Sequence, residues 1–237
     1  MVLDLLPTRT AGAAENMAID LLLLQRYPRE GAARFRHYDW RAPAFTFGYA
    51  QKIEFVRGLL PGEGQFDLCR RPTGGGLVDH RDDWTYALVI PRGHPLEEIR
   101  ATTSYREVHE ALAAALQALG IPAVTKPRPV APAEDEAAGA GVCFQRAEVF
   151  DVVHGRTGEK IAGAAQKRNK RGLLFQGSIW RPSVGAIDWD RFEENFTANL
   201  ARILNCPAEP APWPELAEEE VSGLVDQYSS PEWLASR

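Results

Sequence analysis

The chain has 237 residues, of which 45% are hydrophobic and 25% are charged, so it can bury a full core. Its formal net charge of −5 argues against nucleic acid as a partner, and it has no apolar run of the roughly 18 residues that a membrane span requires. The start of the chain has no basic region before a long apolar stretch, so we expect no signal peptide and a cytoplasmic protein.

The N-terminal half predicts strands around one amphipathic helix. The expected elements are a short strand at 2–6, a helix at 13–26, a pair of strands at 33–40 and 43–49, a strand at 66–71 and a buried strand at 84–91. The last two strands should form a unit with a ligand-binding loop between them. His37 is expected to be an ordinary sheet residue.

The C-terminal half predicts further strands and three helices. Ser104 to Glu107 has the pattern of a capping box, followed by an apolar stripe that ends at Gly120, and His109 on this helix is expected to be exposed or capping. Residues 126–141 are rich in Pro, Ala and Glu and predict a mobile loop. The remaining expected elements are a hairpin of 149–154 and 160–166, a strand at 173–180, a helix at 188–204 and an acidic helix near 215–227.

The predicted strands outnumber the helices and are mostly joined by hairpins or short loops. This pattern predicts an α+β fold with a mixed, largely antiparallel sheet and helices packed on one side. We expect one catalytic domain over residues 1–205 and a helical tail over residues 206–237.

One stretch is rich in groups that can bind a ligand. Residues 70–86 place two arginines before three consecutive glycines, then a histidine and several carboxylates. Glycine allows the backbone to lie directly against a ligand, with N–H groups available to an anion. Taken alone, the same stretch could be a glycine-rich turn between strands.

Residues 70–80 resemble the RRxTGGGxVxH signature of the biotin/lipoate A/B protein ligase family. Residues 159–168 and 172–179 resemble the KxxGxAQxR and GxxxxxGSI block of the same family, and residues 16–20 resemble its first helix. The resemblance covers roughly residues 10–200. It implies the fold shared by class II aminoacyl-tRNA synthetases and biotinyl/lipoyl synthetases.

Cys143 and Lys160 are the expected catalytic residues. Cys143 begins a Cys-Phe dipeptide 17 residues before Lys160 (160 − 143), and this spacing resembles that of the family's cysteine-dependent octanoyltransferases. A cationic amine near a thiol favours the reactive thiolate. Cys69 and Cys206 match no family position and are expected to be structural, and no cysteine has the spacing of a metal site.

The resemblance also implies a set of residues that bind substrate. They are Arg71, Thr73, Gly74, Gly75, Gly76, His80, Gly163 and Ala165. Arg71 and the glycine amides would bind a carbonyl, thioester or phosphate group. His80 could be a general base, or could tie the loop to Asp79, Asp82 or Asp83. An acyl tunnel is expected around Phe45, Phe47, Val89 and Phe144.

The resemblance implies an octanoyltransferase that needs neither ATP nor a metal. Cys143 would take an octanoyl group from an octanoyl-acyl carrier protein and pass it to a lysine of a lipoyl domain or a glycine-cleavage H-type acceptor protein. Two alternatives stay open. One is a lipoate-protein ligase that works through lipoyl-AMP with ATP and Mg, although only 59 residues follow Ser178 (237 − 178), too few for the separate adenylation domain usual in large ligases. The other is a module that binds a lipoyl domain or acyl carrier without turnover.

Overall fold

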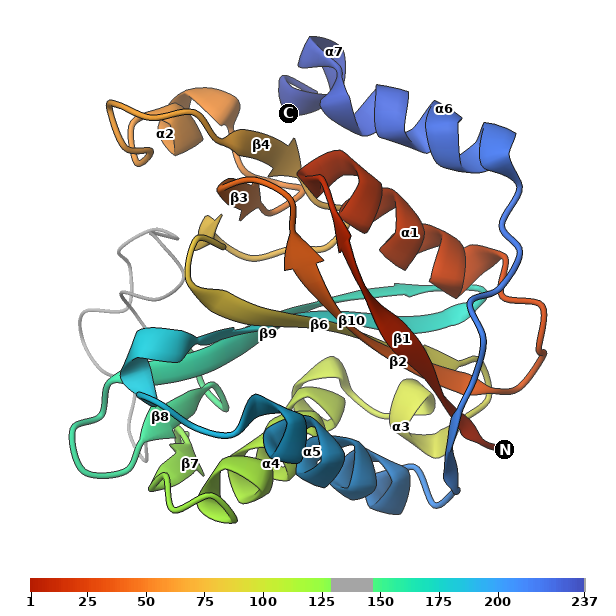
Figure 1. The fold of residues 1–237 in the computed structure, drawn as a ribbon, viewed down its shortest axis with the longest axis vertical. Helices are drawn as coiled ribbons and strands as arrows, with labels where there is room; N and C mark the ends of the chain where they lie inside the picture. The colour runs from red at the N-terminus through yellow and green to blue at the C-terminus, as the bar shows by residue number, and fades with distance from the viewer. Residues whose placement is uncertain (129–146, 237) are drawn as a thin grey trace.

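The computed structural model describes residues 1–128 and 147–236, and its centre is an eight-stranded mixed sheet (Figure 1). The strand order is β11-β1-β2-β6-β10-β9-β8-β7. These strands are β1 (Leu3–Ala11), β2 (Ala33–Trp40), β6 (Asp83–Pro91), β7 (Ala123–Thr125), β8 (Val152–His154), β9 (Lys160–Asn169), β10 (Gly172–Trp180) and β11 (Ala208–Pro210). β1 runs parallel to β2 and β11, and the other pairs are antiparallel. The expected mixed, largely antiparallel sheet is therefore confirmed.

A second, three-stranded sheet has the order β4-β3-β5. It contains β3 (Ala44–Phe47), β4 (Asp67–Arg70) and β5 (Val78–Asp79). The strands expected at 33–40 and 43–49 both form, but they do not pair, because β1 and β6 already occupy both edges of β2. β4 and β6 do not form one unit either, because they lie in different sheets. β2 and β10 occupy both edges of β6, and β4 pairs with β3.

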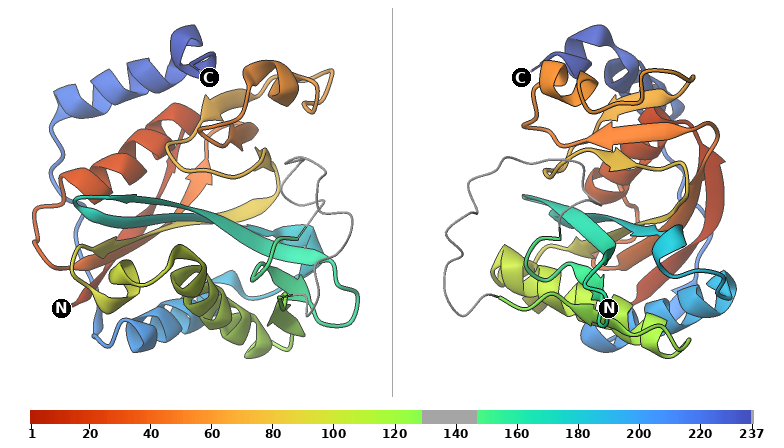
Figure 2. Two further views of the ribbon diagram at one scale, coloured as in Figure 1. Left: turned by 180° about the vertical axis from the view of Figure 1, so that it is seen from behind. Right: turned by 90° about the vertical axis from the view of Figure 1, so that its left-hand side faces the viewer.

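Helices cover both faces of the large sheet, not one side as expected (Figures 1 and 2). The helices are α1 (Ala13–Gln25), α2 (Ile53–Arg57), α3 (Pro95–Glu98), α4 (Ala101–Gln117), α5 (Trp189–Ile203), α6 (Glu218–Ser229) and α7 (Pro231–Leu234), with a 3₁₀ turn at Arg181–Ser183. The reason lies in β6, whose nine residues are all buried. Trp84, Tyr86 and Leu88 pack in the core with α4 and α5, whereas Ala87 and Val89 pack in the core with α1.

Two expectations for helix α4 are wrong. The helix begins at Ala101, so Ser104 lies inside it and donates from its hydroxyl to the Ala101 carbonyl (3.1 Å) instead of capping the start. His109 is fully buried, and its Nδ1 lies 2.7 Å from the carbonyl oxygen of Phe150. It is buried because it follows Tyr105 by one helical turn and faces the same layer.

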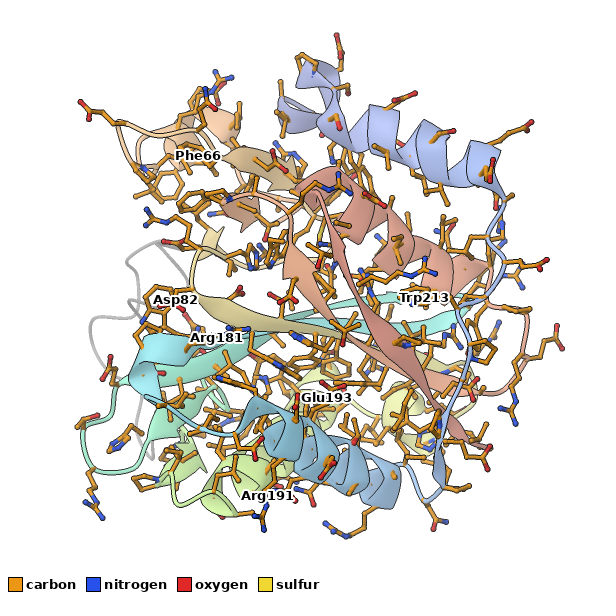
Figure 3. The ribbon with its side chains drawn as sticks, in the orientation of Figure 1. Phe66, Asp82, Arg181, Arg191, Glu193 and Trp213 are labelled. Atoms are coloured by element: carbon orange, nitrogen blue, oxygen red, sulfur yellow. The ribbon has the colours of Figure 1, made fainter. Side chains whose placement is uncertain are left out.

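The end of the chain returns over the first strand and the first helix. Trp213 donates from Nε1 to the Pro7 carbonyl (2.9 Å), and α6 lies along α1 (Figure 3). Arg70, which is fully buried, donates from Nε to the Trp233 carbonyl (3.0 Å) and from one terminal nitrogen to the Leu234 carbonyl (2.6 Å). Helix α7 therefore supports the strand that leads into the glycine loop. Among residues 1–128 and 147–236, no helix combines the length and apolar character needed to cross a membrane.

Candidate functional site

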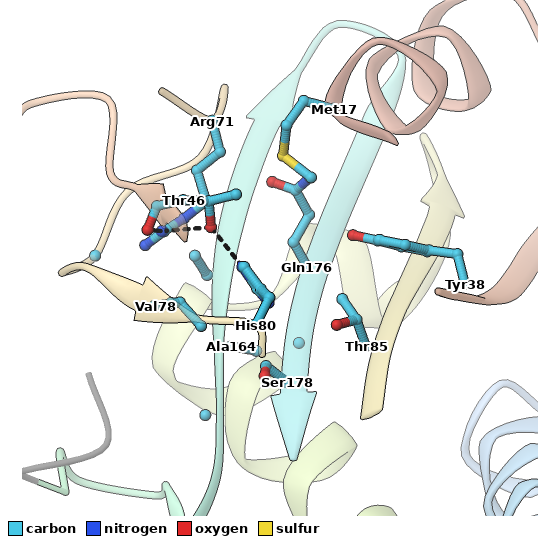
Figure 4. A pocket seen from close by; sticks show the side chains of 14 residues that line it. Met17, Tyr38, Thr46, Arg71, Val78, His80, Thr85, Ala164, Gln176 and Ser178 are labelled. Carbon is cyan, nitrogen blue, oxygen red and sulfur yellow. Dashed lines mark hydrogen bonds between the residues drawn. The ribbon is translucent and has the colours of Figure 1, made fainter. Parts of the chain in front are cut away.

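A cavity lies where the small sheet meets β9 and β10 of the large sheet (Figure 4). The glycine loop contributes Arg71 and Gly75 to its wall, followed by Val78 and His80. The large sheet contributes residues 163–165 from β9 and 176–178 from β10, and Met17 comes from α1. The cavity therefore unites the three segments that the family resemblance singled out.

Glycine has a structural reason at two positions, one opposite the loop and one within it. A Cβ atom on Gly48 would lie 2.0 Å from the carbonyl oxygen of Gly75, so a side chain there would displace the loop. Gly75 itself has φ of 89°, in the region that side chains disfavour. The loop is anchored at its start, where the Tyr49 N–H donates to the Thr73 carbonyl (2.8 Å).

Arg71 braces the glycine loop from inside. Its guanidinium donates to the carbonyls of Gly74 (2.6 and 3.0 Å) and Gly76 (2.9 Å). It also donates to the carbonyl (3.1 Å) and the hydroxyl (3.3 Å) of Thr46 on β3. Arg71 is buried at 4% exposure but reaches the cavity wall, so it both shapes the loop and brings a positive charge beside the cavity.

His80 is tied to Asp83, one of the partners that the sequence left open. Its Nδ1 lies 2.7 Å from Oδ2 of Asp83, and its Nε2 lies 2.7 Å from the Thr46 hydroxyl. The same carboxylate oxygen accepts from the hydroxyls of Thr85 (2.8 Å) and Ser178. These bonds link the small sheet, the loop and strands β6 and β10 at one end of the cavity.

Gln176 on β10 crosses the opposite side of the cavity. Its Oε1 accepts from the Thr73 hydroxyl (2.7 Å), and its Nε2 donates to Oδ2 of Asp20 (2.6 Å). Asp20 in turn forms a fully buried ion pair with Arg36 (2.6 Å). Burial raises the pKa of Asp20, and the positive charge of Arg36 opposes that rise. This network fixes Thr73 and Gln176 to the core beneath α1.

Lys160 begins β9 and is buried at 7% exposure, so it is not a surface lysine. Its Nζ forms an ion pair with Oδ2 of Asp151 (2.7 Å). A Cβ atom on Gly163 would lie 2.9 Å from both Cε and Nζ of Lys160. Gly163 lines the cavity and Lys160 does not, so the tip of Lys160 lies next to a residue of the cavity wall.

The structure brings most of the expected site residues together. Arg71, Gly75, His80, Gly163 and Ala165 line the cavity; Thr73, Gly74 and Gly76 support the loop through the bonds described above. Cys143 lies outside the described residues, as do Phe144 and most of the expected mobile loop.

Two further expectations concern residues that the structure describes. Phe45, Phe47 and Val89, around which the tunnel was expected, are buried in hydrophobic clusters and are not among the residues that line this cavity. Cys69 is fully buried, and burial raises the pKa of its thiol to about 12, which suits a structural cysteine.

Sequence reasoning missed several residues around the site. Asp151 was read only as part of a hairpin, and Gln176 only as part of a motif. Tyr105 falls within the expected capping box, which indicates no contact with the site, yet its hydroxyl contacts Asp151. The sequence offered one signal for Asp151. It is a carboxylate next to the start of a strand, nine residues before Lys160 (160 − 151).

Comparison with known families agrees with this geometry. Residues 12–183 match the lipoyl protein ligase A/B catalytic domain. The chain therefore belongs to this family, and the expected family and fold are confirmed.

Curated relatives are named octanoyltransferase LipM. That of Bacillus cereus is 34% identical over 170 residues, a match that spans 70% of this chain and 60% of the relative. That of Macrococcus caseolyticus is 29% identical over 266 aligned positions, spanning 94% of each chain.

Solved structures show the same fold across the whole chain. A structure described as a lipoate protein ligase from T. acidophilum superposes with a TM-score of 0.76 at 21% identity, covering 100% of both chains. A bi-partite lipoate protein ligase from Thermoplasma acidophilum gives a TM-score of 0.73 at 20% identity, covering 99% of this chain and 96% of that chain.

Proposed function

We propose that the protein is an octanoyltransferase of lipoate biosynthesis. The observation that carries this proposal is the 34% identity to relatives named octanoyltransferase LipM, combined with a cavity built from the family's own motif residues. The substrates would be an octanoyl-acyl carrier protein and a lipoyl-accepting protein. The reaction needs neither ATP nor a metal.

In the proposed first step, the thiolate of Cys143 attacks the octanoyl thioester of the carrier. A new carbon–sulfur bond forms to Cys143, the original one breaks, and the carrier leaves as its thiolate, which then takes a proton from water. The octanoyl chain would occupy the cavity beside Gly163 and Ala165, where each buried methylene contributes about 0.8 kcal/mol. In the second step, a lysine amine of the acceptor attacks the enzyme thioester, forms an amide and releases the thiol of Cys143.

Lys160 would stabilise the thiolate and the negative charge that develops on the carbonyl oxygen. Contacts around Asp151 support this role. Glu148, five residues after Cys143 in the chain (148 − 143), donates its N–H to the same Asp151 oxygen that pairs with Lys160 (2.7 Å for each contact). The chain segment that follows the proposed nucleophile is thus bonded to the partner of the proposed cation.

The second candidate is a lipoate-protein ligase. The observation behind this candidate is the fold match to one chain of a bi-partite lipoate protein ligase, over 96% of that chain. Such an enzyme would need ATP and would not depend on Cys143.

Intact mass spectrometry separates the candidates. The protein is incubated with octanoyl-acyl carrier protein without ATP, and Cys143→Ala serves as the matched variant. An octanoyl adduct on the wild type and none on the variant is the result expected of the transferase. A protein that gives no adduct, but modifies a lipoyl domain when ATP and lipoate are added, would instead be a ligase. A protein that binds carrier or lipoyl domain with neither product would be a binding module.

A further inference from the structure

A buried carboxylate holds the tip of Lys160. The side chains of Lys160 and Asp151 are only 5% and 1% exposed, and their charged atoms lie 2.7 Å apart. A buried ion pair is stable only when hydrogen bonds satisfy the remaining lone pairs. The surroundings of Asp151 meet this condition.

Asp151 accepts two further hydrogen bonds. Its Oδ1 accepts from the hydroxyl of Tyr105 on α4 (2.5 Å), and its Oδ2 accepts from the N–H of Glu148 (2.7 Å). The Tyr105 hydroxyl accepts in turn from the N–H of Ala164 on β9 (3.0 Å). Burial and the neighbouring charge of Asp151 raise the pKa of Tyr105 well above its ordinary value, so the hydroxyl remains a donor. Helix α4 and strand β9 therefore fix the carboxylate from two sides.

Because Gly163 has no side chain, there is space beside it for the end of the Lys160 side chain. A Cβ atom there would lie 2.9 Å from Nζ of Lys160 and 3.2 Å from Oδ1 of Asp151. The ion pair thus lies over a residue of the cavity wall.

We propose that Asp151, held by Tyr105, is a positioning residue that fixes the side-chain amine of Lys160 beside the acyl cavity. This inference rests on the proposed octanoyl transfer. Lys160 then acts through its charge, placed where the thioester carbonyl enters the cavity. Asp151 touches no substrate, and it acts only by holding the ammonium group of Lys160 in place through their ion pair.

The test compares Asp151→Asn with the matched control Asp4→Asn. Asp4 is also 1% exposed, accepts from a tyrosine hydroxyl (Tyr27, 2.6 Å) and pairs with a cation (Arg29, 2.7 Å). It lies on β1, outside the cavity wall. Both substitutions remove a buried carboxylate that contacts a tyrosine hydroxyl and a cation, although Arg29 is 54% exposed and Lys160 only 5%. Only Asp151 is next to the cavity.

We expect Asp151→Asn to slow single-turnover loading from octanoyl carrier about tenfold or more, because the cation is displaced from its position. The concentration of carrier that gives half-maximal loading should change by less than about threefold, since the cavity wall is intact. Tyr105→Phe should give a smaller loss, and Asp4→Asn should load at the wild-type rate. Equal loading by the Asp151 and Asp4 variants at a temperature where both are folded would overturn the inference.

A second readout does not depend on octanoyl transfer. Acetic anhydride labels neutral amines, and peptide mass spectrometry gives the labelling of Lys160 relative to the exposed Lys52. This ratio should rise about tenfold in Asp151→Asn, as expected for loss of a hydrogen bond between charged groups, and stay unchanged in Asp4→Asn. If the wild type takes no octanoyl group but the labelling contrast holds, the proposed function fails while the role of Asp151 in holding Lys160 stands. Equal ratios in the wild type and both variants would refute that role.

Discussion

Asp83 holds His80 through a contact of 2.7 Å between Oδ2 and Nδ1, and the two side chains are 0% and 5% exposed. His80 also stacks on Trp40, with ring centroids 4.1 Å apart. Oδ2 of Asp83 also accepts hydrogen bonds from the hydroxyls of Thr85 on β6 and Ser178 on β10. This one oxygen atom therefore joins the glycine loop to the large sheet.

Replacing Asp83 with Asn should therefore destabilise the protein. The neutral amide can no longer accept all three bonds at one oxygen, and unsatisfied buried groups cost about 1–3 kcal/mol. Urea unfolding at pH 7 measures this loss. Asp82→Asn is the matched control, because Asp82 is exposed, and it should change the free energy of unfolding by less than about 0.5 kcal/mol. Equal stabilities of the two variants would contradict the assigned role of Asp83.

Gly163→Ala should reduce octanoyl transfer without a large loss of stability. The added Cβ would lie 2.9 Å from the end of the Lys160 side chain and 3.2 Å from Oδ1 of Asp151, so the ion pair must shift, whereas its three nearest neighbours include no backbone atom. A displacement of about 1 Å at a reacting group can cost on the order of 100-fold in rate. Steady-state transfer rates and thermal unfolding of the same sample test this expectation. Gly62→Ala is the control, since no atom lies within 4 Å of its Cβ position, and it should keep wild-type activity.

Ala165→Leu should shorten the acyl chain that the enzyme prefers. The methyl group of Ala165 lies 3.8 Å from the Cβ position of Gly75 across the cavity, so a larger side chain fills that space. Each methylene that no longer fits forfeits about 0.8 kcal/mol, or roughly fourfold in relative rate. Competition between hexanoyl and octanoyl carriers measures the shift. Ala114→Leu on the exposed side of α4 should leave the preference unchanged, and an unaltered preference in Ala165→Leu would place the chain elsewhere.

His109 should make the protein less stable in mild acid. Burial lowers its pKa from 6.5 to about 4, although the charge of Asp151 opposes this change. Between these two values the unfolded chain binds a proton that the folded chain does not, so the stabilisation is complete above pH 6.5 and declines as the pH falls toward 4. The loss attributable to His109 between pH 7 and pH 5 should be roughly 2 kcal/mol.

His109→Gln isolates that contribution. Urea unfolding of both proteins at pH 7 and at pH 5 gives the two pH-dependent losses, and their difference belongs to His109. If the variant loses as much stability as the wild type, His109 is already protonated in the folded protein or is not buried.

Local patterns predicted the secondary structure and the loop residues well. The helix predicted at 13–26 forms as α1, and the glycine motif predicted the loop with Arg71 beside it. The expected amphipathic character of that helix is wrong, because the consecutive residues Leu21 to Leu24 are all buried and α6 covers its outer side. These local patterns did not predict which strands distant in the sequence pair with one another. Nothing in the alternation of β2 and β3 indicates that β1 and β6 would occupy both edges of β2.

The same limit applies to the polar groups of the site. The sequence offered three aspartates as partners for His80, and only the three-dimensional arrangement selects Asp83. Asp151 and Tyr105 are 46 residues apart and meet only because α4 packs beneath β9. Pairing of charged groups in a folded core depends on such long-range packing, which periodicity does not encode.

Arg70 also bears on how the protein is made. Two of the acceptors for its buried guanidinium are the carbonyls of Trp233 and Leu234, which the ribosome adds more than 160 residues after Arg70. Until those residues emerge, the guanidinium lacks these two acceptors, and the support beneath the glycine loop is incomplete. Copies cut short before Trp233 should therefore be cleared by cellular proteases and should not persist as weakly active enzyme.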